Sequence, residues 1–153
     1  MKSDKKNQII NLINLATKED KIHQDITSKI SVSKNLKCKM FIKSKNEGIL
    51  FGVNIIILLL KKIDKKIKIK IFKPDGSKLR KGTKILSLEG KAHSILKSER
   101  TMLNFLGHLS GIASETNKLV KKTRIYKTKI CCTRKTIPGL RYLQKQAIKI
   151  GGG

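Results

Sequence analysis

The chain is poor in aromatic residues and in acidic residues. Its 153 residues include no tryptophan, two tyrosines and four phenylalanines, so it offers few rings on which single-stranded bases could stack. Ten aspartates and glutamates stand against 36 lysines and arginines, which gives a formal net charge of +26 at pH 7. Such a charge attracts nucleic acid, an anionic membrane or a polyanionic small molecule alike, so charge alone leaves the class of partner open.

Metal-binding and disulfide patterns are also missing. Cys38, Cys131 and Cys132 form no CxxC pair and lie far from the histidines in the sequence, so a reduced cytoplasmic chain fits best. The first ten residues lack the apolar core of a signal peptide. The apolar run 49–60 is shorter than the roughly 20 residues of a membrane helix, which predicts a buried segment and no membrane partner. Structural roles are expected for the cysteine pair, in a buried strand, and for the three histidines, His23, His93 and His108.

Helical periodicity is clear in two places, and a hydrophobic content of 39% argues against disorder. Apolar residues recur every three or four positions over 5–16 and over 92–105. The apolar segment 53–62 favours a helix over a buried strand because of its length. These three segments predict the helical part of a folded core.

The stretch "SGIASET" at 110–116 predicts a break after the long helix, with Ser114 and Thr116 available as helix caps. A further helix is expected over 119–124, and then a strand over 125–132. This succession suggests the start of a βα unit.

Alternation and turn residues predict the strands. In "KIKIKI", which ends at Ile71, alternation over 66–71 places three isoleucines on one face and three lysines in water. Weaker alternation over 36–43 and short apolar steps over 77–90 predict further β structure, and "KPDG" at 73–76 predicts a turn. The fold class is therefore α/β.

A compact group of cations and hydroxyls follows the last expected strand. Thr133, Arg134 and Lys135 stand just before a Pro-Gly turn in the expected loop 133–141. Beyond the loop, the periodic stretch 143–150 leads into three glycines, which indicate either a close backbone approach or a frayed helix end. A planar guanidinium can hold a carboxylate through two parallel hydrogen bonds, whereas an ammonium or a hydroxyl suits a phosphate.

Four segments in order carry a resemblance to a known family. They are "EDKIHQDITS" (19–28), "PDGSKLRKG" (74–82), "ILKSERTMLNFLGHLSGIASET" (95–116) and "TRKTIPGLRYLQKQAIKIGGG" (133–153). Together they resemble quinolinate phosphoribosyltransferase, also called carboxylating nicotinate-nucleotide pyrophosphorylase. The resemblance implies an N-terminal open-faced α/β domain over 1–112 and, over 113–153, the start of an incomplete TIM-like α/β barrel.

The resemblance also implies a reaction and its partners. Enzymes of this family join quinolinate to phosphoribosyl pyrophosphate with Mg²⁺, forming nicotinate mononucleotide, pyrophosphate and CO₂, and they work as homodimers or higher homo-oligomers. Arg100 matches an arginine that reaches into the neighbouring subunit's site, and Thr133, Arg134 and Lys135 match the substrate-binding triplet. No catalytic residue or metal ligand of this chain is assigned, and no specific nucleic acid is expected as a partner.

Several positions depart from the family pattern. Gln24 stands in place of a glycine, Ser114 in place of a threonine, and Cys132 in place of an acidic residue. The family's His-Arg pair and its later lysine and acidic residues, which serve phosphoribosyl pyrophosphate and Mg²⁺, have no counterpart, and no carboxylate occurs after Glu115. The expectation is a C-terminally truncated copy that is inactive by itself.

Other interpretations of the same residues stay open. Arg100 could be a surface arginine paired with a nearby carboxylate, residues 133–135 could be a solvated basic loop, and Arg141 and Lys145 could be structural or line the site from behind. The whole chain could instead resemble the related molybdenum-operon protein of unknown reaction, or act without catalysis as a basic binder of polyanions.

Overall fold

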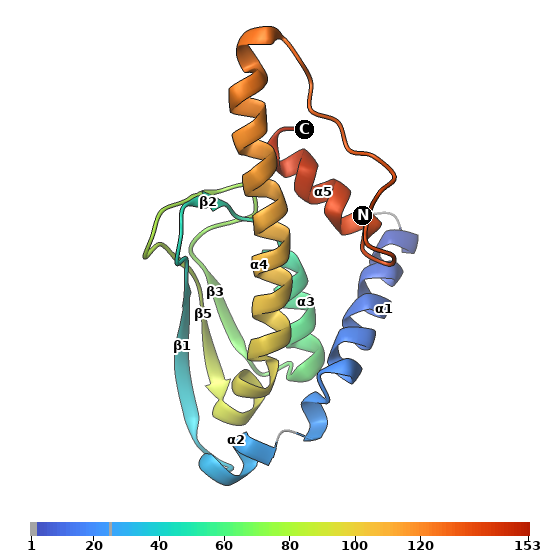
Figure 1. The fold of residues 1–153 in the computed structure, drawn as a ribbon. Coiled ribbons are helices and arrows are strands. Elements are labelled where there is room, and N and C mark those ends of the chain that lie inside the picture. Colours follow the sequence, from blue (N-terminus) through green and yellow to red (C-terminus); the bar gives the residue numbers. More distant parts are fainter. Residues whose placement is uncertain (1–2, 25) are drawn as a thin grey trace.

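The computed structural model describes residues 3–24 and 26–153 and shows a layer of helices on one face of a small sheet (Figure 1). Its elements are α1 (Ser3–Glu19), η1 (Ile22–Gln24), α2 (Ile26–Ser31), β1 (Lys37–Lys43), β2 (Gly48–Ile49), α3 (Val53–Ile63), β3 (Lys68–Ile71), β4 (Lys78–Leu79), β5 (Lys84–Lys91), α4 (Ala92–Thr123), η2 (Arg124–Tyr126) and α5 (Arg141–Gly151), of which η1 and η2 are short 3-10 helices. The α/β fold class is confirmed.

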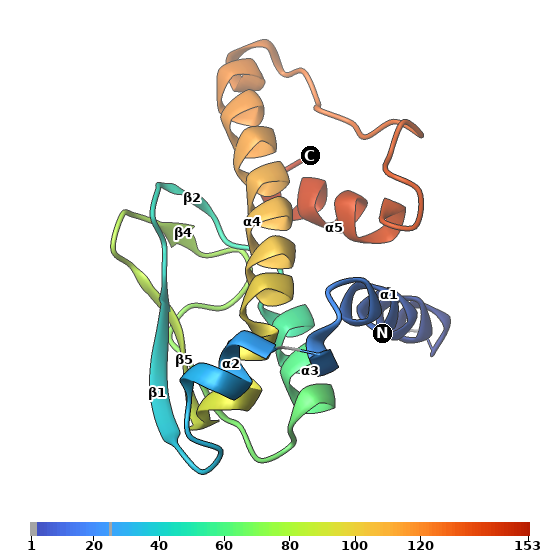
Figure 2. The same cartoon turned by 60° about the horizontal axis from the view of Figure 1, so that its bottom comes forward.

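The main sheet is antiparallel, with strand order β1-β5-β3. Its inward positions are apolar: Ile42 of β1 pairs with Leu86 of β5, and both are buried. Helices α3 and α4 cover this face, and Figure 2 shows α1 and α5 on the far side of α4 from the sheet. The strands expected over 36–43, 66–71 and 77–90 are confirmed, although 77–90 contains β4 and all of β5 except its last residue.

The turn expected in "KPDG" is present and does more than reverse the chain. The amide of Ser77 donates to the carbonyl of Pro74 at 3.2 Å, and Gly76 adopts a φ of 88°. This turn places the Asp75 carboxylate at the start of α3, where one oxygen accepts from the amides of Gly52 at 2.8 Å and Val53 at 2.9 Å. Asp75 therefore caps a helix that begins more than twenty residues earlier in the chain.

Asp64 joins the other end of α3 to the start of α4. Its carboxylate accepts from the Lys66 amide at 2.9 Å and from the Ser94 hydroxyl at 2.8 Å. These two hydrogen bonds hold the pKa of Asp64 below its ordinary value, with help from the nearby cations of Lys91 and Lys66 and against the effect of burial.

The break expected at "SGIASET" is wrong, because α4 runs without interruption from Ala92 to Thr123. The hydroxyls of Ser114 and Thr116 donate to the carbonyls one turn earlier, Ser110 at 2.6 Å and Ile112 at 2.8 Å, so neither is a cap. The same stretch buries Ala113 against the core, and this packing outweighs the weak helix propensity of glycine and serine.

The strand expected over 125–132 is also wrong. Residues 124–126 form η2, and the chain then runs irregularly to α5. A strand needs a neighbour to accept and donate its backbone hydrogen bonds, and no described strand lies beside this segment. Cys131 and Cys132 are exposed, so the expectation that they lie in a buried strand is wrong as well.

The apolar run 49–60 forms β2 and most of α3 and is largely buried, as expected. Its central residues Leu50, Ile56 and Leu59 have no exposed surface. Within the described residues, no helix combines the length and hydrophobicity needed to cross a membrane.

Candidate functional site

The segment 127–140 connects α4 to α5 and carries the expected triplet (Figure 1). The amide of Lys135 donates to the Thr133 hydroxyl at 3.1 Å, and the amide of Thr136 donates to the Arg134 carbonyl at 3.0 Å. These bonds form a tight local turn, and all three residues of the triplet are exposed. The triplet therefore lies in a loop, as expected, but that loop does not follow a strand.

The cations of the triplet have no carboxylate partner among the described residues. The ion pairs there are Lys68–Glu89, Arg100–Asp20 and Lys118–Glu115. Nothing in the described structure thus neutralises Arg134 or Lys135, and both remain available to an anionic ligand.

Hydrogen bonds from α5 hold the end of the loop. The Gln144 amide oxygen accepts from the backbone amide of Ile137 at 3.0 Å, and its nitrogen lies 3.2 Å from Nε2 of His108 on α4. The Arg141 guanidinium donates to the Thr136 hydroxyl at 3.1 Å. Gln144 is buried, so α4 and α5 together set the position of the loop next to the triplet.

Helix α5 approaches α4 closely because Gly151 has no side chain. A Cβ at this position would overlap the Ala113 carbonyl oxygen and lie 2.7 Å from Cβ of Thr116. The Asn117 amide also donates to the Gly151 carbonyl at 3.2 Å. The close backbone approach that the glycines indicate is thus observed, and Gly152, with a φ of 103°, forms the helix C-cap.

A groove lies beside the triplet, between α1 and the start of α5. It has a volume of about 650 Å³ and includes Ile137 and Tyr142 on one wall and Leu12 and Leu15 on the other. Its cationic lining residues are Arg141 and Lys145. Both residues therefore face a groove next to the triplet, and Arg141 also has the structural contact described above.

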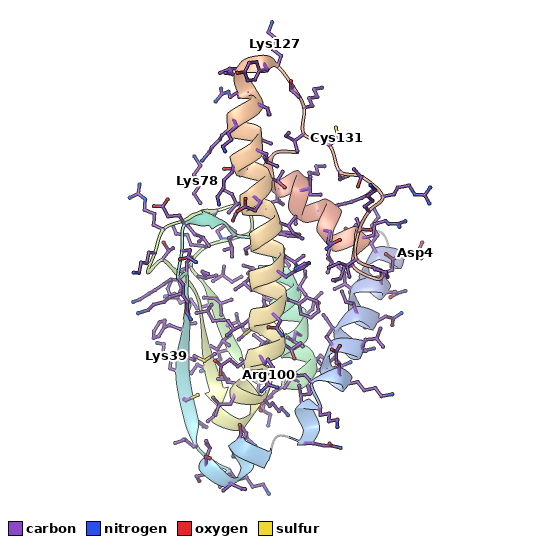
Figure 3. All side chains as sticks on the ribbon, viewed as in Figure 1. Asp4, Lys39, Lys78, Arg100, Lys127 and Cys131 are labelled. Carbon is purple, nitrogen blue, oxygen red and sulfur yellow. The ribbon has the colours of Figure 1, made fainter. Side chains whose placement is uncertain are left out.

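Arg100 lies elsewhere, on the lower part of α4 (Figure 3). Its Nη1 is 2.9 Å from Oδ1 of Asp20, whose Oδ2 accepts from the Thr101 hydroxyl at 2.9 Å. The Arg100 side chain is 79% exposed and that of Asp20 only 17%. Arg100 lines grooves of about 490 and 870 Å³, and neither groove includes a residue of 133–135. Those two grooves do not bring Arg100 to the triplet.

Sequence reasoning missed Asp20 and Gln144. A signal for Asp20 existed, because it is the second acidic residue of "EDKIHQDITS" and directly follows α1. No sequence signal pointed to Gln144, because a glutamine on a helix shows no special role until its neighbours in the fold are known. Gln24, which stands in place of a glycine, is exposed and has no left-handed backbone.

The histidines have structural contacts where they can be described. Nε2 of His93 lies 2.7 Å from the Val32 carbonyl, and His108 contacts Gln144. The side chain of His23 and all of Asp25 lie outside the described residues, so this part of the "EDKIHQDITS" segment is not placed.

Two family models match most of the chain. Residues 25–110 match the family described as "Quinolinate phosphoribosyl transferase, N-terminal domain", and residues 112–153 match "Quinolinate phosphoribosyl transferase, C-terminal domain".

Individual relatives agree with these matches. The "Probable nicotinate-nucleotide pyrophosphorylase [carboxylating]" of Bacillus subtilis is 40% identical over 95% of this chain and 50% of its own length. The protein of the same name from Methanocaldococcus jannaschii is 43% identical over 84% of this chain and 45% of its own. A solved structure, the nicotinate-nucleotide pyrophosphorylase from Francisella tularensis, superposes with a TM-score of 0.91 at 39% identity, covering 96% of this chain and 52% of that one.

The chain thus spans about half the length of the curated relatives it matches. Sequence and fold agree over nearly all of that half, including the segments that contain Arg100 and the triplet. The chain therefore belongs to the quinolinate phosphoribosyltransferase family.

Proposed function

We propose that this chain provides the anion-binding half of a quinolinate phosphoribosyltransferase site. The observation that carries the proposal is the triplet Thr133, Arg134 and Lys135, which is exposed, unpaired with any described carboxylate and held in place by α4 and α5. Relatives that share this half are named carboxylating nicotinate-nucleotide pyrophosphorylases.

The chemistry of the reaction suits such residues. The ring nitrogen of quinolinate attacks the anomeric carbon of phosphoribosyl pyrophosphate, and the bond to pyrophosphate breaks. When the carboxylate next to the nitrogen leaves as CO₂, its bonding electron pair stays on that ring carbon, stabilised by the adjacent positive nitrogen, and a proton from solvent then adds to the carbon. Both steps depend on holding anions in place and on stabilising charge, and neither needs a nucleophilic side chain. Arg134 is suited to a carboxylate of quinolinate, and Lys135 and Thr133 are suited to the phosphates.

Mg²⁺ belongs to this proposal as the partner of phosphoribosyl pyrophosphate. Among the described residues, no group of three or more His, Cys, Asp or Glu side chains could hold a metal ion. Mg²⁺ can be held largely by substrate phosphates and water, so the proposed role of this chain concerns the organic anions.

Arg100 is proposed to serve the site of a second subunit. Asp20 holds one side of its exposed guanidinium, and the grooves that Arg100 lines contain no residue of its own triplet. A homodimer in which each site combines the triplet of one chain with Arg100 of the other would unite them. Three free cysteines, two of them exposed, suit the reducing cytoplasm as the compartment.

The test uses a fusion of this chain to the part of the Bacillus subtilis relative that lies beyond the aligned half, here called the fusion enzyme. We expect quinolinate-dependent release of pyrophosphate from the fusion enzyme and essentially none from the 153-residue chain. A fusion enzyme that is folded and dimeric but shows no turnover with quinolinate would contradict the proposed reaction. Turnover by the chain alone would contradict the proposed division of the site.

Shared sites are tested by mixing two inactive variants of the fusion enzyme, Arg100→Ala and Arg134→Ala. If each site takes Arg100 from one subunit and Arg134 from the other, random pairing at equal amounts restores about one quarter of the sites. Each mixed dimer then has one intact site and one doubly altered site. A mixture that has exchanged subunits and stays inactive would rule out sharing, even if the reaction itself is confirmed.

A further inference from the structure

The outer face of the sheet, turned away from α3 and α4, carries the features of a second binding surface. Side chains on this face come from alternate positions of three strands, and Figure 3 shows them pointing away from the helices, with Lys39 labelled among them. Their positions do not overlap with the triplet, the α1–α5 groove or Arg100. This surface is therefore separate from the residues to which the function proposed above is assigned.

Two of the chain's four phenylalanines meet on this face. Phe41 of β1 and Phe72, which follows β3, have ring centroids 6.5 Å apart and an interplanar angle of 27°. Their residues are 41% and 38% exposed, although neither is a terminal or loop-tip residue. An exposed stacked pair of aromatic rings on an ordered strand surface is the kind of platform on which a nucleobase can stack.

Lysines surround the two rings. The Lys39 and Lys84 ammonium groups lie 5.8 and 5.1 Å from the centre of the Phe41 ring, and the Lys70 ammonium lies 5.4 Å from the centre of the Phe72 ring. The carboxylate that the strands present on this face, Glu89, is paired with Lys68 at 3.7 Å. The face is thus strongly cationic, with the ammonium groups over the rings, from where the flexible lysine side chains could turn aside to phosphates on either side of a stacked base.

A groove continues this surface along the edge of β1. It has a volume of about 950 Å³ and is lined by Phe41 together with the lysines at 39, 43, 45 and 81, without a carboxylate. An anionic chain that stacks a base on Phe41 could extend its backbone into this groove. A row of cations beside an aromatic ring matches a polymer that alternates phosphates with flat rings better than it matches a single small anion.

We propose that the outer face of the sheet binds single-stranded nucleic acid without sequence preference, with Phe41 and Phe72 as the stacking platform and Lys39, Lys70 and Lys84 as phosphate contacts. A lipid surface fits less well, because charged lysines border the two rings. A purely electrostatic attraction of the whole basic chain is the main competing explanation. It predicts no dependence on the rings.

The test measures binding of a fluorescein-labelled oligothymidylate of about 15 nucleotides to the folded 153-residue chain by fluorescence anisotropy. Replacing Phe41 with leucine keeps an apolar side chain but removes the ring, and we expect affinity to fall by at least about fivefold, which corresponds to about 1 kcal/mol of lost stacking. The matched variant Phe41→Tyr keeps the ring and should bind within about twofold of the original chain. Circular dichroism confirms that both variants are folded.

A second pair of variants separates this face from the general charge. Changing Lys39, Lys70 and Lys84 together to glutamine should lower affinity and reduce the slope of log affinity against log salt by about 2, as expected for three phosphate contacts on a single strand. The same change at Lys121, Lys122 and Lys129, all exposed and remote from the sheet, removes equal charge and should have a much smaller effect.

Three results would overturn the proposal. One is equal loss of affinity in the two triple variants, which would assign binding to overall charge. Another is unchanged binding in Phe41→Leu. The third is equally tight, ring-independent binding of duplex DNA or of inorganic polyphosphate, which would identify the surface as a general polyanion site. Activity of the fusion enzyme does not enter any of these measurements, so the outcome is independent of the proposed reaction.

Discussion

Replacing Gly151 with alanine tests the close contact between α5 and α4, because two physical effects predict opposite signs. Alanine has a better helix propensity than glycine by up to about 1 kcal/mol, so a helix considered alone would be stabilised. In the folded chain, however, the new Cβ would overlap the Ala113 carbonyl and the Thr116 side chain. Backbone of a packed helix cannot move aside as a flexible side chain could, and overpacking of this kind costs about 1–3 kcal/mol.

The steric overlap should outweigh the gain in helix propensity, because the last residue of a helix gains less than the full propensity difference. We expect a net loss of about 1–2 kcal/mol in the free energy of unfolding. In a domain of this size that lowers Tm by roughly 2–8 °C. Thermal unfolding followed by circular dichroism at 222 nm measures the change. Gly107→Ala is the matched control, because this exposed position in α4 has no neighbouring atom within 4 Å of a Cβ and should gain stability.

If Gly151→Ala raises Tm as Gly107→Ala does, the close approach of the two helices is refuted. The same result would remove the basis for the fixed position of segment 127–140, because α5 holds the end of that loop through Gln144. A fall in Tm for Gly151→Ala together with a rise for Gly107→Ala would support both.

Three further predictions address the caps and the triplet. Asp75→Ala removes the acceptor of two amides at the start of α3 and should lower the free energy of unfolding by about 1–2 kcal/mol in urea titrations, with a smaller loss for Asp75→Asn. Asp64 has a lowered pKa, so its contribution to stability is present above the unfolded pKa of about 3.9 and is lost as pH falls through the folded pKa. The difference in free energy of unfolding between the chain and Asp64→Asn, about 1 kcal/mol at pH 7, should therefore shrink below about pH 4. A difference that persists undiminished at pH 2 would contradict this role of Asp64. In the fusion enzyme, Arg134→Lys keeps the charge but loses the planar fork and should raise KM for quinolinate at least about tenfold, whereas Lys127→Arg, at an exposed turn remote from the triplet, should leave KM unchanged.

Local sequence patterns predicted the helices, which form their backbone hydrogen bonds within one segment, and the strands of the main sheet. Helices over 5–16 and 92–105 and strands over 36–43 and 66–71 follow apolar spacing that matches their periods, and the helix over 53–62 was predicted from the length of its apolar run. The prediction of a break at 110–116 failed because it rested on the low helix propensity of Gly111 and Ser114, which contacts with distant parts of the chain outweigh. In the structure, Ser114 bridges to the amide of Ile49 at 2.8 Å, a contact with a residue 65 positions away that no local pattern can reveal.

The strand predicted over 125–132 failed for a related reason. A strand-like sequence indicates only that a segment could join a sheet. Whether it does so depends on the presence of another strand to share its hydrogen bonds. Ile125 and Tyr126 are 76% and 73% exposed, so their apolar side chains also find no core in the described structure. The position of the triplet in a loop was predicted correctly, although the element before it was not.

The two parts of the candidate site show where sequence reasoning reaches its limit. Thr133 to Lys135 are adjacent in the chain, so their proximity required no fold, and the motif alone placed them together. Arg100 and Asp20 are 80 residues apart, and only the placement of the segment between α1 and η1 beside α4 makes them partners. An exposed ion pair of this kind contributes at most about 1 kcal/mol, so it is too weak to be the reason that the fold places a largely buried carboxylate there. Asp20 also accepts from Thr101, a second bond that fixes the carboxylate whether or not Arg100 is bound to it. The arrangement therefore does more to orient the Arg100 guanidinium than to stabilise the fold, and the N–H groups that Asp20 leaves free are available to the second subunit's site proposed above.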